Sequence, residues 1–188
     1  MVDMQRSSGI LMPVFSLPSP YGIGTLGQAA RTFVDFLNAA GQTWWQILPV
    51  GPTGYGDSPY QSFSAYAGNP YLIDLDLLRE DGLLTQAEID SSFWEADPAR
   101  VDYGAVYQNR LAVLSIACHR GWERDAEAVA QFSAENRNWL PDYALFMALK
   151  QHFGGKPWMR WPEDIRLRRR EAVERYRKAL SEDVALFT

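Results

Sequence analysis

The stretch TWWQILPVGPTGYGDSPYQSFSAYAGNPYLIDL, residues 43–75, contains the feature that decides the fold: an apolar strand that runs into a long loop. Thr43 to Val50 are mostly aromatic and aliphatic and carry no charge, a composition typical of a buried strand. The next 25 residues, Gly51 to Leu75, show no regular apolar period. Loops of this length inside a compact domain are usually functional or disordered. The many aromatic side chains in this one argue against disorder.

A second strand and a helix precede this stretch. The run GILMPVF predicts a buried strand near Ile10 to Phe15, and Thr25 and Gln28 form a T-x-x-Q capping box that predicts the start of a helix. From Leu26 to Ala40, apolar residues recur every three or four positions and share one helical face, and Gly41 is placed to end the helix. Strand, helix and strand in this order predict a βαβ unit with parallel strands, and hence an α/β fold.

The segment GIGTLG, residues 22–27, matches the G-x-G-x-x-G pattern of dinucleotide-binding folds. That fingerprint places its first glycine in a tight turn directly after a strand, and an acidic residue about 20 positions later. Here the segment SLPSPY separates Phe15 from Gly22, and no acidic residue lies between Asp35 and Asp57. We therefore predict that these glycines serve a tight or positive-φ backbone where a loop enters a helix.

The side chains of the long loop suit a sugar ligand. The C–H face of a sugar ring can lie on an aromatic ring while its hydroxyls bond to polar side chains. The loop also follows the carboxyl end of a parallel strand, where α/β and barrel folds place their ligands. A well-packed loop without a binding role is the alternative, and we prefer it for Tyr66 and Tyr71. The aromatic residues are Tyr55, Tyr60, Phe63, Tyr66 and Tyr71, and the polar ones are Thr53, Asp57, Ser58, Gln61, Ser62, Ser64 and Asn69.

The rest of the chain, about Leu77 to Thr188, has the patterns of helices. Thr85 and Glu88 form a second capping box, and the segment YGAVYQNRLAVLSIACHRG predicts a helix that ends at Gly121. We expect a first part over residues 1–76, with the βαβ unit and the loop, and a helical second part over residues 77–188. The expected apolar face of the helix before Gly121 consists of Val106, Val113, Leu114 and Ala117.

Composition excludes several classes of protein. The 188 residues are 47% hydrophobic and 22% charged, which is ordinary for a globular protein with a sizeable core. A net charge of −5 argues against binding to nucleic acid or to an anionic membrane surface. The N-terminus lacks the apolar core of a signal peptide, and no segment reaches the roughly 18 apolar residues of a membrane span. The single cysteine, Cys118, forms no internal disulfide and favours a cytoplasmic location.

Four further residues invite a functional interpretation that the sequence does not favour. His119 and His152 have no partners at metal-ligand spacing, so we expect no metal site. Asp74 and Asp76, in LIDLDLL, look like paired carboxylates, but their position before an apolar run predicts that they cap the following helix.

Three long segments carry a resemblance to a known family: SLPSPYGIGTLG, WWQILPVGPTGYGDSPYQSFSAYAGNPYLIDL and DYALFMALKQHFGGKPWMRWPEDIRLR. Together they resemble the 4-α-glucanotransferases, which are the amylomaltases or disproportionating enzymes of glycoside hydrolase family seventy-seven. The resemblance extends from about Gly9 to Arg168. It implies the N-terminal part of a (β/α)8 TIM barrel with a mostly helical inserted subdomain, so the barrel is incomplete in this chain.

The resemblance also implies an activity. Family members transfer a segment of an α-1,4-glucan to another glucan or to glucose, with a covalent glycosyl-enzyme intermediate and without a cofactor. The implied partners are therefore α-1,4-glucans and maltooligosaccharides. Retaining transfer needs a carboxylate nucleophile and a carboxylic acid about 5–5.5 Å apart. In the family these groups lie downstream of the segments matched here, and nothing in this chain matches their motifs, so we expect no catalytic residue in it.

The site residues that the resemblance implies belong to substrate binding. Tyr60, in DSPYQS, is similar to the family tyrosine that stacks near the cleavage point, with Asp57 and Ser58 beside it. Tyr55, in TGYGD, is similar to the aromatic residue of a second glucan-binding site in some members, and Tyr103, in VDYG, to its partner.

Two classes of function are compatible with these residues. The first is a 4-α-glucanotransferase of which this chain carries part of the substrate site. The second is a non-catalytic α-glucan-binding module, or a decayed gene fragment, that keeps the aromatic loop without the catalytic carboxylates.

Overall fold

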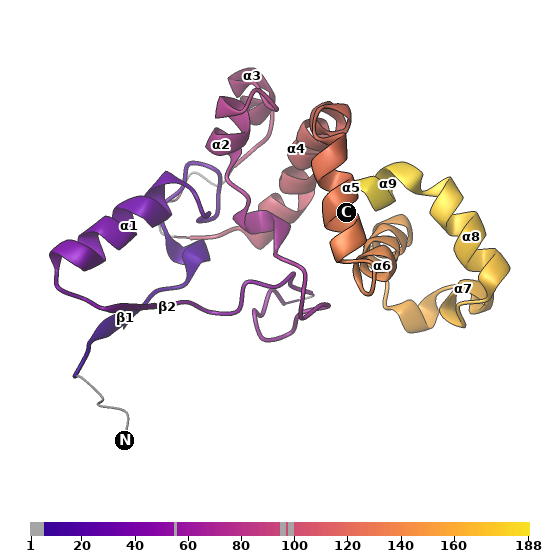
Figure 1. Cartoon of the computed structure of the whole chain (residues 1–188), viewed down its shortest axis with the longest axis horizontal. Helices are drawn as coiled ribbons and strands as arrows, with labels where there is room; N and C mark the ends of the chain where they lie inside the picture. Colours follow the sequence, from indigo (N-terminus) through magenta and orange to yellow (C-terminus); the bar gives the residue numbers. More distant parts are fainter. Residues whose placement is uncertain (1–5, 55, 95–96, 98–99) are drawn as a thin grey trace. The chain divides into compact units, whose positions relative to one another are not determined.

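The computed structural model describes residues 6–54, 56–94, 97 and 100–188. The chain divides into two compact units, Met1–Ala117 and Cys118–Thr188, and Figure 1 labels their elements. Along the described chain, no helix is both long and apolar enough to cross a membrane. The boundary that we predicted between residues 76 and 77 separates the first βαβ unit of a barrel from an inserted helical subdomain. This boundary stays a prediction.

Two short parallel strands form the sheet of the first unit (Figure 1). Strand β1 (Gly9–Leu11) pairs with β2 (Trp44–Gln46), and helix α1 (Gln28–Ala39) connects them. Helix α1 packs against β2 through Phe33 and Trp45, whose ring centroids are 5.1 Å apart. The predicted βαβ unit and the α/β fold are therefore confirmed.

The strands are shorter and more exposed than the sequence predicts. Leu11 is 54% exposed and Trp44 is 64% exposed, although we expected both runs to be buried. After Leu11 the first run leaves the strand and forms the 3-10 turn η1 (Val14–Ser16), in which Val14 is buried. The prediction of buried strands is wrong because a sheet of two strands offers few neighbours to cover the side chains that do not face α1.

The ends of α1 show what two of the glycines do. Thr25 does not cap the helix as predicted, since its hydroxyl donates to the carboxylate of Asp74, and Gly27 occupies the N-cap position instead. A Cβ on Gly27 would overlap Asp74 Oδ2, so any other residue here would force the Asp74 side chain to shift from its bonds to Thr25 and Leu77. At the other end Gly41 has a φ of 69° and ends the helix in a Schellman motif, as predicted.

The next elements along the chain are a 3-10 turn, two short helices and the long helix α4, which extends past Ala117, the last residue of the first unit. Asp74 Oδ1 accepts a hydrogen bond of 3.0 Å from the N–H of Leu77 and caps α2, and Thr85 and Glu88 form the predicted capping box. Helix α4 continues past Gly121, contrary to the prediction, because a glycine inside a helix is tolerated when both flanks favour the helix. The four residues expected on its apolar face are all buried. The elements are η2 (Pro70–Leu72), α2 (Leu75–Glu80), α3 (Gln86–Asp90) and α4 (Tyr103–Arg124).

The second unit is helical and has its own core. Leu145, Ala148 and Leu149 lie on one side of α6 and pack with Trp161 and Ile165. This core is separate from the clusters of the first unit, so each unit buries apolar surface by itself. The elements are α5 (Ala126–Glu135), α6 (Leu140–His152), η3 (Trp158–Arg160), α7 (Glu163–Arg166), α8 (Arg170–Ala179) and α9 (Ser181–Leu186).

Candidate functional site

The long loop is an ordered structure that is closed at its neck. The N–H of Asn69 donates to the carbonyl of Val50 at 2.8 Å, so residues 50–69 form a closed loop that begins four residues after β2. Further out, Thr53 and Ser62 form an antiparallel bridge. The loop is thus a compact projection from the carboxyl end of a parallel strand, the end at which α/β folds place their ligands.

The tip of the loop is a turn that presents Tyr60. The N–H of Gln61 donates to the carbonyl of Ser58 at 3.1 Å, which makes Pro59 and Tyr60 the central residues of the turn. Proline is favoured at the first central position because its φ is already fixed near the value that the turn requires. The side chain of Tyr60 is 73% exposed. The turn therefore holds an aromatic face toward solvent on a restrained backbone.

Asp57 lies within electrostatic range of two tyrosines. Its φ is 52°, in the left-handed region that non-glycine residues seldom adopt. Burial raises the pKa of the Asp57 carboxyl above its ordinary value. Burial and, second, the charge of Asp57 raise the pKa of Tyr71 and of Tyr103. Both phenol hydroxyls therefore stay protonated at neutral pH and keep their capacity to donate hydrogen bonds.

Arg110 of α4 donates a hydrogen bond to Ile73, near the C-terminal end of the loop. Its side chain has no exposed surface, and its Nη2 donates to the carbonyl of Ile73. Burial lowers the pKa of Arg110 to about 10, although the charge of Asp74 opposes this shift. The guanidinium also lies over the ring of Trp94, 5.9 Å from its centroid. No motif in the sequence singled out this residue.

The comparison with known proteins identifies the family. A family model described as 4-alpha-glucanotransferase matches residues 12–188. The chain belongs to the 4-alpha-glucanotransferase family. The resemblance seen in the three sequence segments is therefore confirmed over nearly the whole chain.

Individual 4-alpha-glucanotransferases agree with this assignment. The chain is 49% identical to that of Thermus thermophilus, over 98% of this chain and 37% of the relative. It is 47% identical to that of Clostridium butyricum, over 92% of this chain and 36% of the relative. The structure is similar to that of amylomaltase from Streptococcus agalactiae in complex with acarbose, with a TM-score of 0.92 and 42% identity over 97% of this chain and 37% of that chain. The chain thus spans little more than a third of the length of these relatives.

Within this member of the 4-alpha-glucanotransferase family, the structure brings together some of the predicted site residues. Asp57 and Ser58 are half-buried beside the exposed Tyr60, and Asp57 is in electrostatic range of Tyr103. Tyr55 lies outside the described residues. Their roles in substrate binding stay predictions.

The two tyrosines for which we preferred a packing role differ from each other. Tyr71 is 8% exposed and belongs to a core cluster with Ile23 and Val106, so the packing interpretation is confirmed for it. Tyr66 is 73% exposed, so its side chain is not packed in a core as expected, and its lack of a binding role stays a prediction. In the described chain, no group of three or more His, Cys, Asp or Glu residues could hold a metal ion.

The left-handed backbone of Asp57 leads to a stability prediction. Asp57→Gly is expected to raise the free energy of unfolding by about 0.5–1 kcal/mol, because glycine adopts this φ without steric strain. Asp35 is an exposed acidic residue inside α1 and provides the matched control. Asp35→Gly is expected to lower stability by about 1 kcal/mol, since glycine is unfavourable within a helix. Urea titrations of both variants measure the difference, and equal losses of stability would show that Asp57 carries no strain.

Proposed function

We propose that the chain forms the N-terminal, substrate-binding part of a 4-alpha-glucanotransferase built on a (β/α)8 barrel. Such an enzyme transfers a segment of an α-1,4-glucan to another glucan or to glucose through a covalent glycosyl-enzyme intermediate. The observation that carries the proposal is the exposed ring of Tyr60 on a restrained turn, at the carboxyl end of a parallel strand, in a chain of this family.

The proposed roles follow from what each side chain can offer. Tyr60 supports the C–H face of a glucose ring near the scissile bond. Ser58 and Asp57 lie beside it in sequence and offer hydrogen bonds to sugar hydroxyls. Tyr55 and Tyr103 contribute to a second glucan contact. The carboxylates that carry out the transfer come from outside this chain.

The ligand is proposed to be a neutral α-glucan. A solved relative, the Streptococcus agalactiae amylomaltase, is in complex with acarbose, which supports a saccharide ligand for this chain as well. The proposed chemistry requires no cofactor, and the proposed location is the cytoplasm, in keeping with the single cysteine.

A chimera tests the proposed function. Residues 12–188 of this chain replace the matching segment of the Thermus thermophilus 4-alpha-glucanotransferase. The chimera is expected to convert maltotriose into glucose and longer maltodextrins, as the unmodified Thermus enzyme assayed in parallel does. The chain by itself is expected to show no turnover, because it contains no match to the catalytic carboxylates. A folded chimera that binds maltodextrins without transferring glucosyl units would instead favour the non-catalytic binding module.

A further inference from the structure

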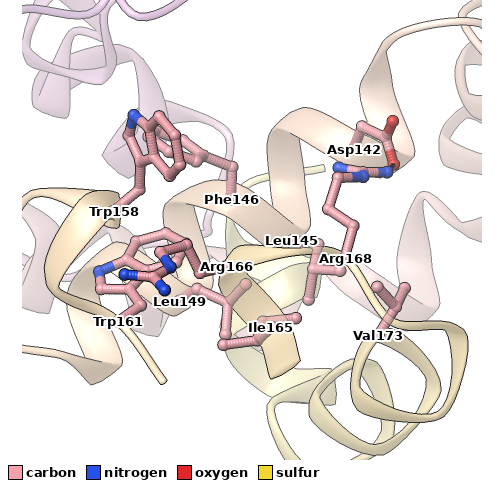
Figure 2. Close-up of a pocket in the computed structure, with 10 residues that line it drawn as sticks. All are labelled: Asp142, Leu145, Phe146, Leu149, Trp158, Trp161, Ile165, Arg166, Arg168 and Val173. Carbon is pink, nitrogen blue, oxygen red and sulfur yellow. Dashed lines mark hydrogen bonds and ion pairs between the residues drawn. The ribbon is translucent and has the colours of Figure 1, made fainter. Parts of the chain in front are cut away.

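The second unit contains a pocket that the proposed function does not use. Its volume is about 380 Å³, within the range of about 300–1,000 Å³ that is usual for small-molecule sites. In Figure 2, Trp158 and Phe146 lie at one end of the pocket, and Asp142 and Arg168 lie at the other. Leu149 and Ile165 form part of the apolar wall between them. The pocket thus combines an aromatic end with a polar end.

The aromatic end consists of one fixed and one exposed indole. Trp161 is 7% exposed, its Nε1 donates to the carbonyl of Lys156 at 3.1 Å, and its ring centroid lies 5.5 Å from that of Phe146. Trp158, one 3-10 turn earlier, is 52% exposed. The buried indole anchors the segment, while the exposed indole offers a flat apolar face to a ligand.

The charged groups of the pocket are already engaged with one another or with the backbone. Arg168 Nη2 and Asp142 Oδ1 are 2.7 Å apart, and Arg166 Nη1 donates to the carbonyl of Met159 at 3.2 Å. A ligand with its own full charge would have to compete with these contacts. A neutral ligand with many hydroxyls would not, because the remaining lone pairs and N–H groups can still bond to hydroxyls. An aromatic face beside such groups fits a sugar ring.

The backbone of Arg168 ends helix α7 in a left-handed conformation. Its φ is 53°, at the position after helix α7 where glycine is favoured, and its N–H donates to the carbonyl of Ile165 at 3.0 Å. The N–H of Arg169 also donates to the carbonyl of Asp164 at 2.8 Å, and the two bonds form a Schellman motif that ends α7. The motif fixes the backbone from which the side chain of Arg168 lines the pocket.

We propose that this pocket is an accessory α-glucan site, in which Trp158 stacks on a glucose ring while Asp142 and Arg168 bond to its hydroxyls. The choice of an α-glucan among neutral sugars rests on the proposed function. The site lies in the second unit and is distinct from the loop that carries Tyr60 in the first. It holds a glucan independently of the residues near the scissile bond.

Affinity electrophoresis of the whole chain in native gels that contain amylose tests the site. All variants carry Tyr60→Ala, so that the loop contributes less to binding. We expect this parent to be retarded by amylose, and Trp158→Ala to weaken its binding roughly tenfold, as truncation of an aromatic anchor does. Trp158→Phe is expected to have an intermediate effect. Trp122, a second exposed tryptophan of this unit outside the pocket, is the matched control, and Trp122→Ala is expected to bind like the parent.

Arg168→Gly separates binding from folding. Glycine adopts the backbone of Arg168 without strain, so this variant is expected to melt at or above the temperature of the parent while it binds amylose severalfold more weakly. The proposal is overturned if the parent is not retarded, or if Trp158→Ala and Arg168→Gly bind like the parent. If the accessory site is overturned in this way but the chimera transfers glucosyl units, the proposed function is retained. Conversely, binding that depends on Trp158 alongside an inactive chimera would remove the proposed function and retain the site.

Discussion

In the chimera with the Thermus enzyme, Tyr60→Ala is expected to lower kcat/KM for maltotriose by an amount equivalent to about 2–4 kcal/mol. The ring of Tyr60 is held by the turn from Ser58 to Gln61, and Pro59 limits how far the backbone before it can move. A ring in a fixed place supports the sugar most as its anomeric centre gains positive charge. Contacts that strengthen in the transition state are the ones that increase the rate.

Two further variants define the role of the Tyr60 side chain. Tyr60→Phe keeps the aromatic face and loses the hydroxyl, so it is expected to cost less than Tyr60→Ala. Tyr66 is equally exposed on the same loop, at 73%, and Tyr66→Ala is the matched control with a small expected effect. If Tyr60→Ala retains the kcat/KM of the unmodified chimera with an unchanged melting temperature, Tyr60 has no part in transition-state binding and the loop is not at the active site.

Arg110→Ala is expected to lower the free energy of unfolding by about 3–5 kcal/mol. The side chain of Arg110 is fully buried, so its removal leaves a cavity between α4 and the segment at the end of the loop. It also leaves the carbonyl of Ile73 without the guanidinium that donates to it. Urea titration of the whole chain, followed by tryptophan fluorescence, measures the loss.

A second substitution at the same position separates packing from hydrogen bonding. Arg110→Met keeps most of the side-chain volume and removes the donor, so it is expected to cost only about 1–2 kcal/mol. Arg31, which is exposed on α1, is the matched control, and Arg31→Ala is expected to change stability by less than about 0.5 kcal/mol. An Arg110→Ala variant as stable as Arg31→Ala would mean that the buried guanidinium does not hold the loop end to α4.

Features that depend on a few neighbouring residues were predictable from the sequence. The capping box of Thr85 and Glu88 and the end of α1 at Gly41 use side chains and backbone within one helical turn. The apolar face of α4 follows from the helical period alone. The order of strand, helix and strand is equally local, so the parallel pairing of β1 and β2 was predictable as well.

Features that depend on contacts across the chain were not predictable. Thr25 has the sequence of a helix cap, but its hydroxyl bonds to Asp74, which lies far along the chain. Arg110 looks like an ordinary charged residue of an exposed helix until α4 packs against Ile73. The exposure of the strands could not be predicted either, because burial depends on which elements cover a sheet and the strand sequence does not specify them.

The candidate site shows the same division. Tyr60 could be singled out because the segment DSPYQS resembles the family motif that carries the stacking tyrosine. Asp57 and Tyr103 lie in two segments that share no sequence pattern. The effect of the Asp57 charge on the pKa of Tyr103 could therefore not be predicted before the two residues were seen in the folded chain. The difference in exposure between Tyr66 and Tyr71 likewise depends on contacts across the chain, because Tyr71 packs in the cluster with Ile23 and Val106 and Tyr66 is exposed.

The bond between Asn69 and Val50 at the neck of the loop has a consequence for how this family can diversify. Because this bond joins the two strands of the loop at its base, we expect residues inserted or exchanged between Gly54 and Pro59 to change the reach of the tip without shifting β2 or α2. The entropic cost of a longer loop grows only slowly with its length. If the tip binds substrate as proposed, we expect selection to vary substrate preference there almost independently of folding, and a tip sequence from one homologue to function when it is transplanted into another.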